Sequence, residues 1–165
     1  AMLAGIMKEH GFRTGLYTSP HLARVEERIR VDGAAIPPRR FRELLTGLKA
    51  AIDGLMAEGR LAYHPTYFEV LTALAFLRFA ERKVDIAVLE VGMGGRFDAT
   101  NVVRPLVSVI TTIAKEHEKH LGSTREKIAF GRLRHLRSLI EGKFPEVDEF
   151  DRHIERIGRN HAHAP

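Results

Sequence analysis

The feature that most constrains the fold is the run at residues 84–89, apolar except for Asp85, which stands between a helix-forming segment and a glycine cluster. A continuous, largely β-branched run of this length predicts a strand that is covered on both faces. The preceding residues 66–80 are apolar around most of a helical circumference, which predicts a buried helix. Strands that alternate with helices in this way predict a three-layer α/β fold, a mainly parallel sheet with flanking helices.

Other segments fit the same alternation. Residues 14–17 and 106–113 are predicted as strands, and the strong turn signal Asp32-Gly33 predicts a small β-hairpin over 28–36. Three further segments have helical spacing of apolar residues together with start or stop signals. The helices are therefore predicted at residues 1–10, 37–59 and 123–139.

The chain has 165 residues, which bounds it to one domain. The pattern of elements degrades near its end, so we expect one α/β domain over 1–141 and a divergent, frayed tail over 142–165. No apolar run approaches the roughly 18 residues that cross a bilayer, and no secretory signal is visible, so a cytoplasmic protein with no membrane partner is expected. Cysteine is absent, which excludes disulfides and thiolate metal sites.

The net charge of +5 arises from 26 Lys and Arg against 21 Asp and Glu, and it favours anionic partners. These charges are interspersed along the chain, aromatic residues make up only 7%, and there is no Trp. A nucleic-acid-binding module would show a basic stripe with stacking aromatics, so nucleic acid is not the expected partner. Only the net charge supports that alternative.

Polar side chains follow the three predicted strands where each strand ends. Ser19 and His21 follow the first strand, Glu90 follows the second, and Glu116 and His117 follow the third. Because ligands gather beyond the carboxyl ends of parallel strands, a hydroxyl, a carboxylate and an imidazole meeting there could hold Mg²⁺.

Each of these residues also has an ordinary explanation. Ser19 precedes Pro20 and could only shape a turn, Glu90 could pair with an arginine, and His117 lies among charged residues typical of a solvated surface. The sequence Gly92-Met-Gly94-Gly95 lets the backbone approach a ligand, but it is not a phosphate-binding P-loop, and the 165 residues contain no such loop.

Several motifs occur together and in order. They are Leu16-Tyr-Thr-Ser-Pro-His-Leu22, Glu27-Arg-Ile-Arg30, Thr66-Tyr-Phe-Glu69, Val88-Leu-Glu-Val-Gly-Met-Gly-Gly-Arg-Phe-Asp-Ala-Thr-Asn101, and Ser108-Val-Ile-Thr111 with Glu116-His117 and Leu121-Gly122. Over roughly residues 1–130 the chain resembles folylpolyglutamate synthase and the bifunctional dihydrofolate synthase, members of the Mur ligase superfamily. The resemblance implies a partial central domain of the Mur ligase type.

The resemblance also implies an activity. Such enzymes are ATP-dependent amide ligases that phosphorylate a pteroate or folate carboxylate, which the amine of L-glutamate then attacks. By position, Ser19, Glu90 and His117 correspond to the family's Mg²⁺ ligands. The family's folate-contacting segment corresponds to Thr66, Tyr67, Phe68 and Glu69, although Phe68 could equally belong to the core of an apolar helix. The implied partners are ATP, a folate or dihydropteroate and L-glutamate, and a monomer is expected.

Three departures from the family pattern qualify the implied activity. The family's phosphate loop would precede Ala1, Glu116 replaces an Asp, and Gly131-Arg132 replaces a Glu-Lys pair whose lysine is carbamylated. Arginine cannot take that role because its guanidinium stays protonated. The family is also more than twice as long, with a C-terminal glutamate-binding domain. We therefore expect an inactive fragment, or a mis-terminated reading frame, of such a ligase; the alternative is a non-catalytic relative that binds folate or nucleotide.

Overall fold

The computed structural model of the chain describes residues 1–92 and 98–109. The chain divides into two compact units, Ala1–Gly92 and Met93–Pro165, and each is described by itself. The first unit contains, in chain order, α1 (Met2–Glu9), β1 (Thr14–Tyr17), the 3-10 helix η1 (Val25–Arg28), β2 (Ile29–Val31), β3 (Ala34–Ala35), α2 (Pro38–Ala57), α3 (Tyr67–Glu81) and β4 (Ile86–Leu89). The described part of the second unit contains the 3-10 helix η2 (Ala99–Val102).

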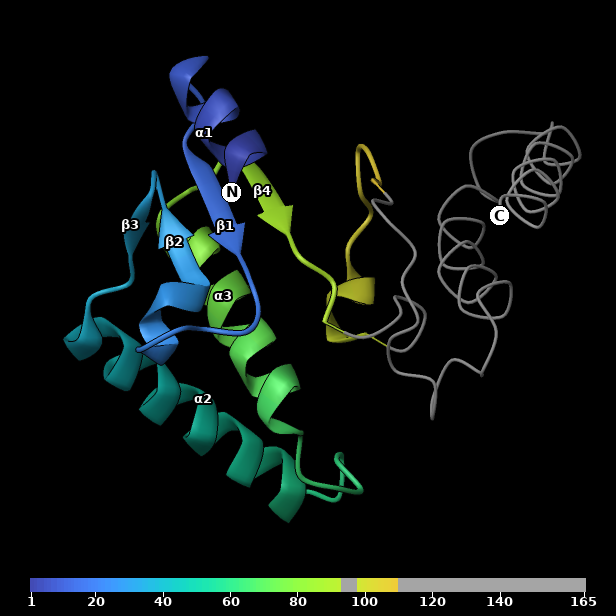
Figure 1. Ribbon diagram of the computed structural model, residues 1–165. Helices are drawn as coiled ribbons and strands as arrows, with labels where there is room; N and C mark the ends of the chain where they lie inside the picture. The colour runs from blue at the N-terminus through green and yellow to red at the C-terminus, as the bar shows by residue number, and fades with distance from the viewer. Residues whose placement is uncertain (93–97, 110–165) are drawn as a thin grey trace, which may run out of the picture. The chain divides into compact units, whose positions relative to one another are not determined.

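The four strands form one sheet in the order β3-β2-β1-β4 (Figure 1). β1 and β4 run parallel, with Thr14 opposite Ile86 and Tyr17 opposite Leu89. The β1–β2 and β2–β3 pairs are antiparallel, so the predicted hairpin extends the sheet rather than standing apart from it. The predicted α/β class is confirmed, and the described sheet is mixed.

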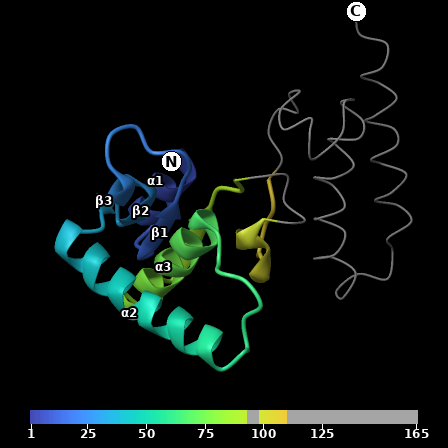
Figure 2. The ribbon, with the colours of Figure 1, turned by 90° about the horizontal axis from the view of Figure 1, so that it is seen from below.

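The helices flank this sheet. α3 packs on β1 and β2, and α2 packs on α3, as Figure 2 also shows. Pro38 occupies the first turn of α2, where its fixed φ angle suits the helix and its missing N–H is not needed. Within the first unit the predicted helices at 1–10, 37–59 and 66–80 are confirmed, with ends shifted by one or two residues.

The core lies between the sheet and α3. Tyr17, Ile29 and Leu74 are fully buried there. Gly15 lets α3 approach the sheet closely, because a Cβ at this position would lie 2.9 Å from the ring of Phe79. The small residue in β1 therefore sets the distance between helix and strand.

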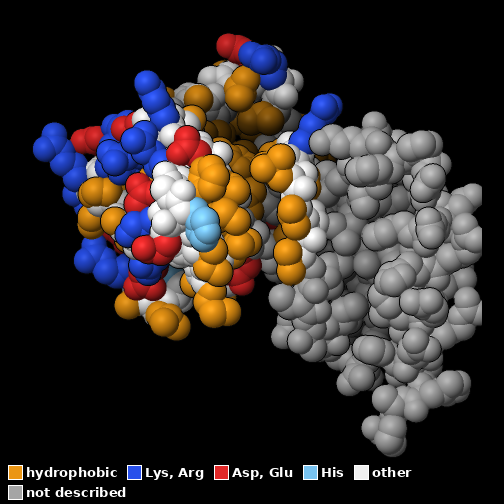
Figure 3. Space-filling model, turned by 90° about the horizontal axis from the view of Figure 1, so that it is seen from above, with side chains coloured by type: hydrophobic (Ala, Val, Ile, Leu, Met, Phe, Trp, Pro, Cys, Tyr) orange, Lys and Arg blue, Asp and Glu red, His pale blue; other side chains and the backbone are white. Residues whose placement is uncertain are grey.

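α1 packs against β1 and β4 and leaves apolar side chains in solvent. Met2 is 86% exposed and Ile6 is 53% exposed. Figure 3 views the molecule from the side on which α1 lies in Figure 1 and shows hydrophobic side chains gathered there. In the part of the chain that the structure describes, no helix is both long and apolar enough to span a membrane.

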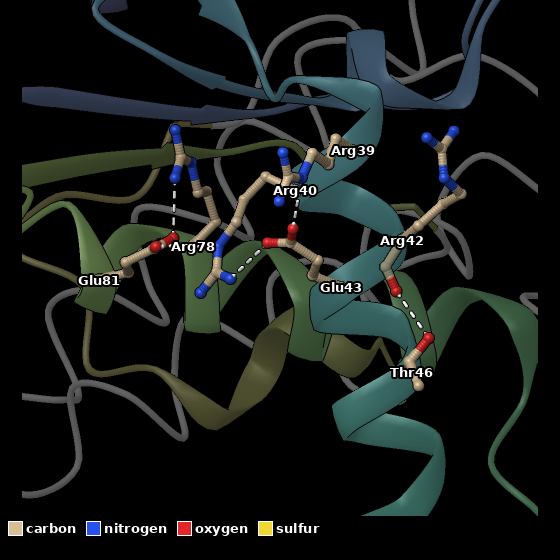
Figure 4. Close-up of polar contacts among 7 residues, drawn as sticks. All are labelled: Arg39, Arg40, Arg42, Glu43, Thr46, Arg78 and Glu81. Carbon is tan, nitrogen blue, oxygen red and sulfur yellow. Dashed lines mark hydrogen bonds and ion pairs between the residues drawn. The ribbon is translucent and has the colours of Figure 1, made fainter.

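Ion pairs within α2 and within α3 meet at one pair between the two helices, Arg40 with Glu81 (Figure 4 shows these residues). Arg40 Nη1 donates to Glu43 Oε2 at 2.8 Å within α2, and Arg40 Nε lies 2.9 Å from Glu81 Oε1 of α3. Arg78 Nη1 donates to the other oxygen of Glu81 at 2.8 Å. This guanidinium is the largest cause that lowers the pKa of Glu81, and Arg40 contributes further. The carboxylate of Glu81 therefore links α3 to α2 through Arg40, and it is also paired within α3 with Arg78.

Two sequence expectations need correction. β4 is not covered on both faces: Ala87 is exposed and the rest of β4 is half-buried. β1 pairs with one edge of β4, but no described strand pairs with the other edge. In the predicted strand 106–113, the described residues 106–109 form no strand, and Leu106 is 87% exposed. β-branched composition favours a strand only where a partner strand and burial are supplied. Residues 110–113, the predicted helix at 123–139 and the boundary near residue 141 lie outside the described residues.

Candidate functional site

The parallel pairing of β1 with β4 brings Ser19 and Glu90 together at the carboxyl edge of the sheet. The backbone N–H of Ser19 donates to Glu90 Oε2 at 3.1 Å. The backbone N–H of Glu90 donates to the carbonyl oxygen of Tyr17 at 2.9 Å, which continues the parallel ladder past the end of both strands. The structure thus places two of the three predicted metal ligands side by side.

The donor set of this pair suits a hard cation. One carboxylate oxygen of Glu90 is held by the backbone, while its second oxygen and the Ser19 hydroxyl have no hydrogen-bond partner among residues 1–92 and 98–109. Mg²⁺ binds few protein oxygens and completes its shell with water and substrate phosphates, so a hydroxyl and a carboxylate fit it. His117, the third predicted ligand, lies outside the described residues. Within the residues that are described, no cluster of three His, Asp, Glu or Cys side chains could hold a metal.

The loop that carries Ser19 is held by Glu27 of η1. The carboxylate of Glu27 accepts hydrogen bonds from the backbone N–H groups of Leu22 at 3.0 Å, Ala23 at 3.3 Å and Arg24 at 3.0 Å. The Leu22 N–H is the largest cause that lowers the pKa of this carboxyl below its ordinary value. Three amides on one carboxylate fix the course of the loop immediately after Ser19.

Arg28, the last residue of η1, is buried beside the same loop. It is 8% exposed, and its Nε donates to His21 Nδ1 at 2.9 Å. The centre of its guanidinium lies 5.7 Å from the ring centroid of Tyr67, a cation–π contact. Sequence reasoning used Arg28 only as part of a motif, and no local pattern in the sequence signals its burial.

The segment 66–69 begins α3, and two of its residues cap this helix. The Glu69 N–H donates to Thr66 Oγ1 at 3.3 Å, and the Thr66 N–H donates to Glu69 Oε2 at 2.7 Å, which forms a capping box at the start of α3. The Thr66 hydroxyl also donates to Glu69 and is the largest cause that lowers the pKa of this carboxyl. The spacing Thr-x-x-Glu carried this signal in the sequence.

The two aromatic residues of this segment differ in their surroundings. Phe68 packs against Tyr17 with ring centroids 5.8 Å apart, and a Cβ at Gly92 would lie 2.6 Å from its ring, so Phe68 is a packing residue. Tyr67 is 60% exposed and presents the only ring of the segment that a flat ligand could reach from solvent. Contact of these four residues with folate stays a prediction.

Comparison with known proteins identifies relatives of this chain. No protein-family model matches the chain. The dihydrofolate synthase/folylpolyglutamate synthase of Bacillus subtilis is 43% identical over 131 residues, which are 78% of this chain and 30% of that protein. A solved complex of FPGS with AMPPCP and folate has a TM-score of 0.77 at 40% identity and covers 81% of this chain and 32% of that one. Escherichia coli FolC in complex with DHPP and ADP has a TM-score of 0.72 at 37% identity, covering 81% and 30%.

The first unit therefore has the α/β fold of Mur ligase-like proteins, with Ser19 and Glu90 in contact at the carboxyl edge of its sheet. Within that class, the chain is a homologue of part of the folylpolyglutamate and dihydrofolate synthases. It spans about 30% of the length of the curated relative described above.

Proposed function

We propose that the chain carries part of the Mg²⁺-, ATP- and folate-binding machinery of an ATP-dependent ligase that joins L-glutamate to a folate or dihydropteroate carboxylate. The observation that carries this proposal is the contact of Ser19 with Glu90, in a chain that is 40% identical to a protein solved with AMPPCP and folate. A cytoplasmic location and a monomeric state are part of the same proposal.

Ser19 and Glu90, with His117, would hold the cation. A bound Mg²⁺ neutralises phosphate charge and orients phosphate oxygens, which is the chemistry this reaction class needs. The chain's own residues prepare that site: the Ser19 N–H orients the Glu90 carboxylate, and Glu27 holds the loop that follows Ser19. Tyr67 offers an exposed aromatic face to a flat pterin ring.

The 165 residues contain no phosphate loop, in which backbone N–H groups and a lysine grip the phosphates. We expect the chain assayed by itself to bind a divalent cation weakly and to form no polyglutamate from ATP, Mg²⁺, a folate and labelled glutamate. Product above a no-protein blank would contradict the inactive state. The alternative, a non-catalytic relative that binds folate or nucleotide, predicts tight binding of one of these ligands without turnover.

The metal site is tested with Mn²⁺, an oxygen-seeking probe whose free concentration can be followed by electron paramagnetic resonance. Ser19→Ala and Glu90→Gln should each weaken Mn²⁺ binding by about tenfold or more, because the first removes the hydroxyl oxygen and the second removes the negative charge of the carboxylate. The control is Glu58→Gln, which removes an exposed carboxylate paired with Arg60. Equal affinities in all three variants and the unaltered chain would overturn the site assignment.

A further inference from the structure

Arg28 is a buried cation, and the two contacts that its side chain makes with described residues are both with uncharged rings. It is 8% exposed, and its contacts are the imidazole of His21 and the ring of Tyr67. No carboxylate pairs with it within the described ranges 1–92 and 98–109. Burying a charge without an opposite charge beside it costs free energy. The burial of Arg28 therefore needs a reason other than surface packing.

The two contacts lie in the two segments proposed to bind ligands. His21 stands two residues after Ser19, in the loop that leaves β1, and Tyr67 is the first residue of α3. The loop and the helix are far apart in sequence, and the guanidinium touches both. A rigid, planar group of this kind can donate along its edge and stack with its face at the same time.

The hydrogen bond also settles the protonation pattern of His21. Arginine has donors only, so His21 Nδ1 must accept, and the imidazole proton then sits on Nε2. Across the described residues, Nε2 has no hydrogen-bond partner of its own. His21 is thereby held in one orientation, and its Nε2–H stays without an acceptor among the residues that the structure describes.

We infer that Arg28 is a positioning residue that fixes the metal-binding loop against the start of α3, so that the cation site and the aromatic face of Tyr67 are held as one unit. The link to a cation site and to folate rests on the proposed function. The fixing of the loop against α3 by Arg28 can be tested separately. Arg28 itself contacts neither the cation nor the folate in this scheme; it acts through His21 and Tyr67.

The test uses the full chain labelled with ¹⁵N, and all variants are compared at pH 8. In Arg28→Met, the His21 Nδ1 resonance should move toward that of an imidazole in water, and the Leu22 amide should exchange at least about tenfold faster. Arg28→Lys should restore the His21 resonance in part, because a donor remains, but not the ring shifts of Tyr67. The matched control is Arg24→Met, which removes an arginine that is 64% exposed and paired with Glu26.

If Arg28→Met does not fold, His21→Ala provides a second test. It removes the acceptor while the guanidinium stays, and the Tyr67 ring protons should shift because the guanidinium is released from one side. Binding of Mn²⁺ and of folic acid should both weaken in Arg28→Met, whereas Ser19→Ala should weaken Mn²⁺ alone. Unchanged His21, Leu22 and Tyr67 signals in the Arg28 and His21 variants would overturn the inference. Absence of Mn²⁺ and folic acid binding to the unaltered chain would overturn the proposed function instead.

Discussion

The backbone amide of Ser19 donates to the side chain of Glu90, so the contact between the two predicted ligands does not consume the serine hydroxyl. This has a direct consequence for mutagenesis, because the hydroxyl can be removed while the bond that orients the carboxylate stays. Ser19 and Glu90 are thus separable in experiment although they are neighbours in space.

Ser19→Ala should leave the melting temperature of the chain unchanged within about 1–2 °C, since the substituted side chain makes no hydrogen bond with the described residues. Glu90→Leu should lower it, because the Ser19 N–H loses its acceptor. Thermal unfolding followed by circular dichroism measures both. A melting temperature that falls equally in the two variants would show that the hydroxyl is part of the structure.

The Glu27 carboxylate makes the stability of the chain depend on pH. Its pKa is lowered in the folded state, so its contribution is present above the ordinary glutamate pKa and is lost as the pH falls through the lowered value. Glu27→Gln should therefore destabilise the chain at pH 7 and flatten the loss of stability below about pH 4.5. Urea unfolding at a series of pH values tests this, with Glu58→Gln as the control. Parallel pH curves for Glu27→Gln and the unaltered chain would contradict the role of the carboxylate.

Gly15→Ala should destabilise the first unit by about 1–3 kcal/mol, because the added methyl would lie 2.9 Å from the ring of Phe79 and would force α3 away from β1. The same substitution at Gly47, inside α2, meets nothing within 4 Å and should stabilise by about 0.5–1 kcal/mol. Urea unfolding of the two variants should show opposite signs. Equal effects would mean that Gly15 is not the limiting contact.

Thr66→Ala should cost about 0.5–2 kcal/mol, because it removes the N-cap of α3 and half of the capping box. Thr46→Ala in α2 is the matched control: its hydroxyl only donates back to the Arg42 carbonyl, so its loss should change stability by less than about 0.5 kcal/mol. If Thr66→Ala leaves urea unfolding unaltered but weakens folic acid binding, Thr66 acts on the ligand and the capping role is wrong.

Much of the first unit was predictable because its signals are local. The Asp32-Gly33 turn and the spacing of apolar residues in α2 are both set by a few neighbouring residues, and the structure follows them. The cover on β4 was not predictable in this way. It depends on which strands and helices come to lie beside β4, and the composition of residues 84–89 contains no information about those neighbours.

The candidate site likewise has a part that the sequence predicts and a part that it does not. Ser19 and Glu90 could be placed together from the sequence because the ends of parallel strands meet at one edge. The clamp by Glu27 and the burial of Arg28 depend on the path of an irregular loop, for which a sequence has no periodicity to read. Thr66 and Glu69 were assigned to a ligand alone, although their spacing also predicts a capping box.

The sequence separation of the contacts around Ser19 has a consequence for the order in which the chain folds. The β1–β2 pair and the Arg28–His21 bond close short loops, since the latter joins residues only seven apart, whereas Ser19 and Glu90 are 71 residues apart. Closing the longer loop costs more chain entropy and slows the step that requires it. We therefore expect the loop around Ser19 to be shaped early by its sequence neighbours, and the contact between Ser19 and Glu90 to form only when β4 pairs with β1.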